Sequence, residues 1–106
     1  MKYWIHPDAN EELHASGDYY ATNANNSVAF AFISEFERVI ALLIENQQRG
    51  PHSENGIRLY HFKQFPFTVF YEEDELKGPQ IFAVAHQSRE PGYWKDRLTE
   101  EVPPSD

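Results

Sequence analysis

Residues 81–86 read Ile-Phe-Ala-Val-Ala-His, and this run decides the fold that we predict. It has almost no polar interruption, which is typical of a central β-strand covered on both faces. Two more strands are predicted before it, at residues 57–62 and 67–71, with a corner at Phe65-Pro66 and a polar loop over 72–79. Since short connections join antiparallel neighbours, this half of the chain is predicted to form a three-stranded antiparallel meander.

The residues before this meander change to a helical period. Asp8 is followed three residues later by Glu11, which resembles a capping box and predicts a helix over residues 8–21. An Asn-rich turn follows, and Asn26 or Ser27 is predicted to cap a second helix. Because the link is short, we expect the two helices to form an antiparallel hairpin.

The second helix carries the stronger pattern and is predicted to end at Gly50-Pro51. Apolar residues recur along it at steps of four and three, as expected for a helix with one face in the core. The stripe consists of Phe32, Phe36, Val39 and Leu43, and it is widened by Phe30, Ile33, Ile40 and Ile44.

A short strand over residues 2–5 precedes the helices, and Pro91 is predicted to open a last helical turn. The resulting order is an N-terminal strand, a two-helix antiparallel hairpin, a three-stranded antiparallel meander and a short C-terminal helix. This is an α+β domain with two helices on an antiparallel sheet. We expect it to span residues 1–98, with a flexible, acidic and proline-rich tail over 99–106.

Composition limits the function without identifying it. The 106 residues suffice for one core, and the absence of cysteine excludes a disulfide scaffold, a thiolate metal site and a thiol nucleophile. No apolar run approaches the ~20 residues of a membrane span, and the start lacks a signal core, so we expect a cytoplasmic protein with no membrane partner. The net charge of −8 argues against strong direct binding to nucleic acid.

The exit from the last predicted strand carries a resemblance to a known family. Residues 83–97 read AVAHQSREPGYWKDR, which resembles the C-terminal signature of the RelE/ParE toxin superfamily. Pro7-Asp8-Ala9 with Glu12-Leu13 is similar to the family's first helix, and Phe65-Pro66-Phe67 with Tyr71 looks like its central hairpin. Arg58 lies where a strand arginine is usual in the family. The resemblance covers roughly residues 3–98.

This resemblance implies the toxin of a type II toxin–antitoxin, or plasmid stabilisation, system, neutralised by a small cognate antitoxin. The superfamily has two branches with this fold. RelE-like members cut messenger RNA in the ribosomal A site, whereas ParE-like members act on DNA gyrase and block replication. Both activities inhibit growth.

The residues favour the ParE-like branch. RNA cleavage needs an acid, a base and several cations for the charged transition state. This chain has Thr68 where the RNase pattern places an arginine, and residues 51–57 contain no lysine. The candidate catalytic set of that alternative is reduced to His86, Arg89 and Tyr93. The Pro91-to-Trp94 motif fits the ParE-like side better, so we lean towards a protein that is not an enzyme.

The predicted target-binding surface combines arginines with aromatic rings, a pairing common at protein interfaces. It consists of Arg58, His86, Arg89, Tyr93, Trp94 and Arg97. Three structural alternatives stay open. The two rings cap the sheet; the arginines pair with Glu90, Asp96 or the acidic loop; and His86 ends its strand and hydrogen-bonds locally.

Other chemistry has less support in the sequence. His61 is predicted to reach His86 across the sheet, but the two lack metal-site spacing, so no metal and no cofactor is expected. Ser88 is not expected to converge on His86 as a nucleophile pair.

We therefore predict a ParE-like toxin that binds a protein target, with DNA gyrase as the candidate. The alternatives are a RelE-like ribosome-dependent endoribonuclease and a non-toxic interaction module of the same fold.

Overall fold

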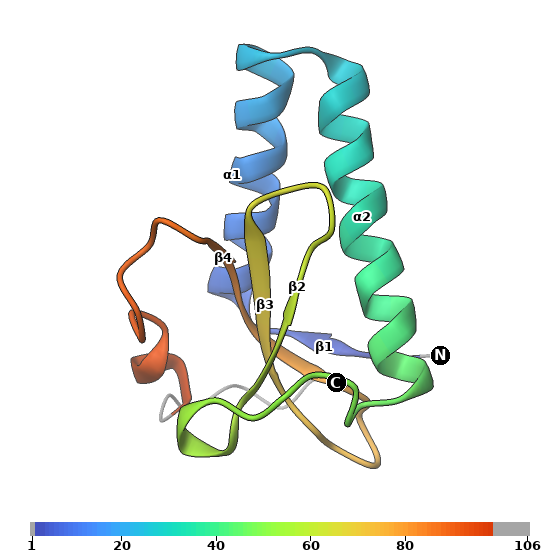
Figure 1. Ribbon diagram of the computed structural model, residues 1–106, viewed down its shortest axis with the longest axis vertical. Helices are drawn as coiled ribbons and strands as arrows, with labels where there is room; N and C mark the ends of the chain where they lie inside the picture. Colours follow the sequence, from blue (N-terminus) through green and yellow to red (C-terminus); the bar gives the residue numbers. More distant parts are fainter. Residues whose placement is uncertain (1, 99–106) are drawn as a thin grey trace.

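The computed structural model describes residues 2–98, and the predicted tail over 99–106 lies outside them (Figure 1). Its elements follow the predicted order. They are β1 (Trp4–Ile5), α1 (Pro7–Asn23), α2 (Asn26–Glu45), a 3-10 turn (Glu54–Gly56), β2 (Arg58–His61), β3 (Phe67–Glu72), β4 (Gln80–His86) and a final 3-10 turn (Lys95–Leu98). The α+β class is confirmed. Within the described part of the chain, no helix is long and apolar enough to cross a membrane.

The four strands form one sheet in the order β1-β4-β3-β2. The meander of β2, β3 and β4 is antiparallel, as predicted. The expectation of a wholly antiparallel sheet is wrong, because β1 pairs with β4 in parallel, through Trp4 with Gln80 and Ile5 with Ile81. Parallel pairing needs a long crossover, and the antiparallel helix pair supplies one by carrying the chain from β1 to the far edge of the sheet (Figure 1).

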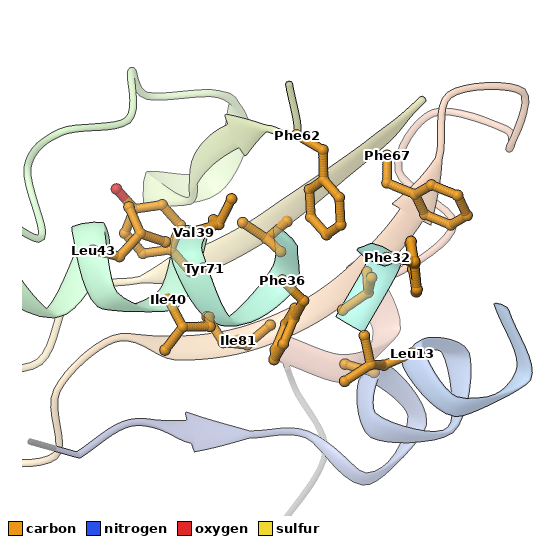
Figure 2. Close-up of a cluster of buried hydrophobic side chains, with 13 residues drawn as sticks. Leu13, Phe32, Phe36, Val39, Ile40, Leu43, Phe62, Phe67, Tyr71 and Ile81 are labelled. Carbon is orange, nitrogen blue, oxygen red and sulfur yellow. The ribbon is translucent and has the colours of Figure 1, made fainter. Parts of the chain in front are cut away.

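One face of the sheet is covered by the two helices, and the main core lies between them. Figure 2 shows Phe32 of α2 between Phe67 of β3 and Leu13 of α1, with Phe36 one turn along the helix near Ile81. Phe32 contacts the ring of Phe67 at 4.8 Å between centroids. The buried members are Ala9, Leu13, Phe32, Phe36, Val39, Ile40, Leu43, Phe62, Phe67, Val69, Tyr71, Ile81 and Val84.

The predicted stripe on α2 is confirmed except at Phe30, where the prediction is wrong. Phe30 is 76% exposed, whereas Phe32 is fully buried. Each residue turns an α-helix by about 100°, so positions two apart lie about 200° apart around the axis. A helix that buries Phe32 against the sheet must therefore present Phe30 to solvent.

The opposite face of the sheet carries a second, smaller cluster of Ile57, Phe82, Ala83 and Trp94. A β-bulge creates it. The register pairs Phe70 with Ala83 and Tyr71 with Ile81, so Phe82 is skipped. An extra residue of this kind interrupts the alternation of side chains. Phe82 and Ala83 therefore both reach the second cluster, while Ile81 and Val84 belong to the main core.

The ends of the helices differ from the predicted caps. His6 caps α1, because its Nδ1 accepts a hydrogen bond from the Asp8 amide at 3.0 Å. The prediction of a capping box at Asp8 is thus wrong. Pro7 already begins the helix, at the first position, where an amide proton would have no partner within the helix. Asn25 caps α2 through the Val28 amide at 2.9 Å, one residue before the predicted cap.

The helix α2 ends at Glu45, five residues before the predicted stop, because side chains of the sheet hold the following loop. The Tyr71 hydroxyl donates to the Gln47 carbonyl at 2.7 Å and accepts from the Gly50 amide at 3.0 Å. A Cβ atom on Gly50 would lie 2.2 Å from the Leu59 carbonyl oxygen, so only glycine allows this close approach.

A carboxylate on α2 fastens the β2–β3 connection to the helix. Glu35 is buried and accepts from the Lys63 amide at 2.6 Å, while Arg38 donates two hydrogen bonds to it at 2.9 and 2.8 Å. The Arg38 hydrogen bonds lower the pKa of Glu35 from 4.5 to about 2; the Lys63 and Gln64 amides add to this, and burial opposes it. The acid is therefore ionised whenever the protein is folded near neutral pH.

We predict that Phe32→Ala lowers the free energy of unfolding by about 3–5 kcal/mol, since it removes a fully buried ring from the main core. Phe30→Ala is the matched control two residues away and should change it by less than about 0.5 kcal/mol. Urea unfolding followed by circular dichroism measures both. Similar losses for the two variants would contradict the placement of the buried face of α2.

The contribution of Glu35 to stability is predicted to depend on pH. Because the pKa in the folded state lies below its ordinary value of 4.5, the contribution is fully present above pH 4.5 and is lost as pH falls through about 2. The stability difference between the wild type and Glu35→Gln should therefore shrink over this range. Thermal unfolding as a function of pH measures it, with the exposed Glu37→Gln as the control. A constant difference would contradict the assignment.

Candidate functional site

Residues 87–98 leave β4 and fold back over the second face of the sheet, on the side opposite α2 (Figure 1). Gly92 has a φ of +76°, a conformation that favours glycine and turns the chain toward the sheet. Trp94 is only 3% exposed and stacks on Phe70 of β3, with 4.8 Å between ring centroids. Trp94 therefore caps the sheet, and the final 3-10 turn begins at Lys95, after the predicted Pro91 start.

Glu12 on α1 holds this segment through one partly buried carboxylate. Its Oε2 accepts from the Tyr93 hydroxyl at 2.7 Å and from Arg97 Nη2 at 2.8 Å. Its Oε1 accepts from Arg97 Nη1 and from the Val84 amide, each at 3.0 Å. Arg97 Nη1 also donates to the carbonyl of the bulged residue Phe82 at 2.9 Å. The ion pair thus satisfies backbone groups of Phe82 and Val84, which lie beyond the two residues of β4 that pair with β1.

The electrostatic surroundings keep both partners of Glu12 protonated. Burial is the main cause of the raised pKa of Tyr93, and the hydrogen bond to the Glu12 carboxylate raises it further. Burial lowers the pKa of Arg97, but its hydrogen bonds and charge interaction with Glu12 outweigh this and raise it overall. Arg97 therefore has a structural role in this contact.

Arg58 is also held by a carboxylate, and it lies apart from the rest of the predicted surface. Its Nε donates to Glu73 at 2.6 Å, and its Nη1 donates to the Gly50 carbonyl at 2.6 Å. Arg58 begins β2, whereas His61 at the other end of that strand approaches the C-terminal segment. This ion pair with the acidic loop matches the structural alternative for Arg58.

Arg89 differs from these two arginines. It is exposed, and its guanidinium carbon lies 3.8 Å from the centroid of the Tyr93 ring. Among residues 2–98, no carboxylate lies within ion-pair distance of it. Stacking on an aromatic face orients the guanidinium plane and leaves its edge N–H groups available. Arg89 therefore presents a fixed positive charge without a counter-ion in the described part of the chain.

His86 ends β4 and hydrogen-bonds locally. Its Nδ1 accepts from the Ser88 amide at 3.0 Å, and the Ser88 hydroxyl lies 2.7 Å from the same nitrogen. Ser88 and His86 come together because the chain turns directly after β4, where the Arg89 amide donates to the His86 carbonyl. Both contacts fix the imidazole, which also meets the Phe67 ring at 5.1 Å.

These side chains surround a hollow of about 230 Å³ between the C-terminal segment and the ends of β2 and β3. His61 and Thr68 are cross-strand partners in it, with His61 Nδ1 2.7 Å from Thr68 Oγ1. Of the predicted surface, the structure brings together here His86, Arg89, Tyr93 and Trp94. Arg58 and Arg97 do not line it.

Sequence reasoning missed two residues of this region. In the sequence, Thr68 stands out only as the position where an arginine of the RNase pattern is absent. Its pairing opposite His61 places it in the hollow. Glu12 was not a candidate, because nothing local signals a partner more than 80 residues away. In the described part of the chain, no group of three or more acidic, histidine or cysteine residues could hold a metal ion.

Comparison with known proteins agrees with this architecture. Residues 3–91 match the family described as the ParE toxin of type II toxin–antitoxin systems, parDE. No curated protein sequence matches the chain. A solved structure from the chromosomal ParDE toxin–antitoxin system of P. aeruginosa is similar, with a TM-score of 0.69 and 22% identity; the match covers 81% of this chain and 95% of that one. At this identity, the structural likeness shows the fold.

We predict that Glu12→Gln lowers the free energy of unfolding by about 3 kcal/mol, because it leaves the largely buried Arg97 charge with only the more distant and more exposed Asp8 carboxylate, at 3.8 Å. Trp94 fluorescence should also shift to longer wavelength as the C-terminal segment loosens. Glu11→Gln, at the exposed neighbouring position, is the control and should be close to wild type. Equal stability of the two variants would contradict the role of Glu12.

Proposed function

This chain belongs to the ParE toxin family of type II toxin–antitoxin systems, and we propose that it inhibits growth by binding a protein target, with DNA gyrase as the candidate. The binding surface is the exposed part of the C-terminal segment, centred on Arg89, Tyr93 and His86. Trp94 and Arg97 support this surface from below, and Arg58 lies apart from it; each of the three is occupied by contacts within the fold.

The observation that carries this proposal is the distribution of the arginines between ion pairs within the fold and solvent. An RNase of this fold needs several cations around the scissile phosphate, because the transition state gains negative charge. Here, Glu12 neutralises Arg97 and Glu73 neutralises Arg58, so among the described residues Arg89 is the arginine that lines the hollow without an ion pair. One oriented arginine beside aromatic rings is better suited to protein recognition.

The family also implies an antitoxin partner, which we propose covers part of this surface or the helical hairpin. Phe30 and Tyr19 are 76% and 62% exposed on that hairpin, so it offers apolar area for a partner. Because the chain carries a net charge of −8, an acidic antitoxin tail would be repelled over long range. Burial of apolar surface therefore contributes more to this contact than charge does.

One observation favours a RelE-like nuclease as the second candidate. His61 and His86 line the same hollow as Arg89, so an acid, a base and a cation are near one another. Imidazole side chains are the groups that most often act as the acid and the base in enzymatic proton transfer. Under this alternative, His61 joins His86, Arg89 and Tyr93 in the catalytic set.

Inducible expression in growing cells distinguishes the two. We expect growth arrest with a DNA-damage response and continued translation, and we expect Arg89→Ala to abolish it by removing the exposed cation. Lys77→Ala, another exposed cation at the far end of β4, is the matched control and should stay toxic. Circular dichroism of the purified variants confirms that both are folded.

Two outcomes would overturn the proposal. Translation arrest with messenger RNA cleavage that is lost in His61→Ala and His86→Ala would establish the nuclease. Normal growth at high expression without an antitoxin would indicate an interaction module.

A further inference from the structure

The hollow beside Arg89 adjoins a second one, and His86 lines both. The second hollow has a volume of about 340 Å³ and lies between α1 and the end of the sheet, where the chain leaves β4 beside α1 (Figure 1). Its walls are Ala15, Ser16, Tyr19, Tyr20, Phe67 and His86. The two hollows therefore lie on either side of the end of β4.

We propose that the two hollows form one groove for an extended segment of the protein target, which places an apolar side chain between α1 and β4 and an acidic side chain on Arg89. This inference rests on the proposed function, because it takes the partner to be a protein. It adds the chemistry of the segment that is recognised and assigns a role to α1, which the sequence signature does not include.

The hollow between α1 and β4 suits an apolar side chain. Tyr19 and Tyr20 of α1 and Phe67 of β3 provide aromatic walls, and Tyr20 contacts Phe67 at 6.4 Å between ring centroids. An apolar cavity of ~150 Å³ is enough to hold benzene, so this larger, open hollow accommodates a phenylalanine or leucine side chain. Tyr19 is 62% exposed, which leaves area for the incoming group to bury.

The hollow beside Arg89 suits a carboxylate. The guanidinium is oriented by its stack on Tyr93, and it has no counter-ion among residues 2–98. The planar guanidinium fork matches a carboxylate through two parallel hydrogen bonds. Glu90 also lines this hollow but is not within ion-pair distance of Arg89, so the guanidinium is left for an incoming carboxylate. His61 and Thr68 add polar groups, and Phe70 and Trp94 add apolar surface for the stem of the side chain. The net charge of −8 disfavours the alternative of a nucleic-acid phosphate.

The register of the strands indicates that the segment is extended. Phe67 pairs with His86 and faces the helices, whereas Thr68 pairs with Ala85 and faces the C-terminal segment. A ligand that reaches both hollows must therefore cross the end of β4 over His86. In an extended chain, successive side chains point to opposite sides, so neighbouring residues can reach both hollows across such a crossing. In a helix, residues three or four apart share one face.

A peptide titration tests this inference directly. The probes are acetylated, amidated peptides with one phenylalanine and one glutamate separated by one, two or three glycines, and matched peptides with lysine in place of glutamate or alanine in place of phenylalanine. Binding to the full chain is followed by amide chemical shifts. We expect the peptide with one of these spacings to perturb the amide shifts of residues in both hollows. Replacing its glutamate or its phenylalanine should weaken binding by about tenfold each.

Charge reversal separates recognition from structure. Arg89→Glu should invert the preference, so that the lysine peptide binds more tightly than the glutamate peptide. Lys77→Glu is the control and should keep the preference for glutamate. Ala15→Trp should remove the preference for phenylalanine by filling the apolar hollow, whereas Ala31→Trp, at an exposed position on α2, should not.

Equal binding of all peptides, no binding, or an unchanged preference in Arg89→Glu would overturn the inference. Binding of a short RNA oligonucleotide in the same hollows, in place of the peptides, would also overturn it. The proposed function is judged separately by the expression experiment. Toxic protein without peptide preference refutes the groove alone, and peptide preference without toxicity refutes the toxin assignment alone.

Discussion

The carboxylate of Glu12 receives four hydrogen bonds from β4 and the C-terminal segment, and the second face of the sheet depends on them. The Phe82 carbonyl lies beyond the residues of β4 that pair with β1 and accepts from Arg97, whose guanidinium Glu12 neutralises and orients. The same carboxylate anchors the Tyr93 hydroxyl. With that residue fixed, its neighbour Trp94 is positioned over Phe70, so one ionised group joins the first helix to the last turn.

This arrangement divides similar side chains between different roles. Arg97 and Arg58 are held by carboxylates and backbone carbonyls, so their charges contribute to folding. Arg89 comes from the same short signature as Arg97 but rests on the outer side of Tyr93, with its charge facing solvent. The hydroxyl of Tyr93 is thus anchored by Glu12, while the face of its ring carries the exposed guanidinium of Arg89. Recognition by this surface depends on how well the ring is fixed.

Much of the fold could be predicted because its signals are local. The stripe from Phe32 to Leu43 follows the helical period, and the run at 81–86 marks the central strand. The predictions failed where partners are distant or unusual. The imidazole of His6 replaced the expected cap, and β1 joined β4 in parallel through a crossover that no local pattern describes. The prediction for Phe30 was wrong for another reason. Phe30 is apolar, but it lies about 200° around the helix axis from the buried Phe32 and therefore faces solvent.

For the site, the sequence by itself determined that His86, Arg89 and Tyr93 would be close together, because a few residues of one turn separate them. It also determined the family, through the signature that leaves the last strand. Only the tertiary structure decided which arginines are neutralised, that Trp94 is buried, and that His61 and Thr68 share the hollow with Arg89. The reason is physical: pairing of charges and burial of rings depend on which distant segments meet, and strand register and helix packing set those contacts across the whole chain.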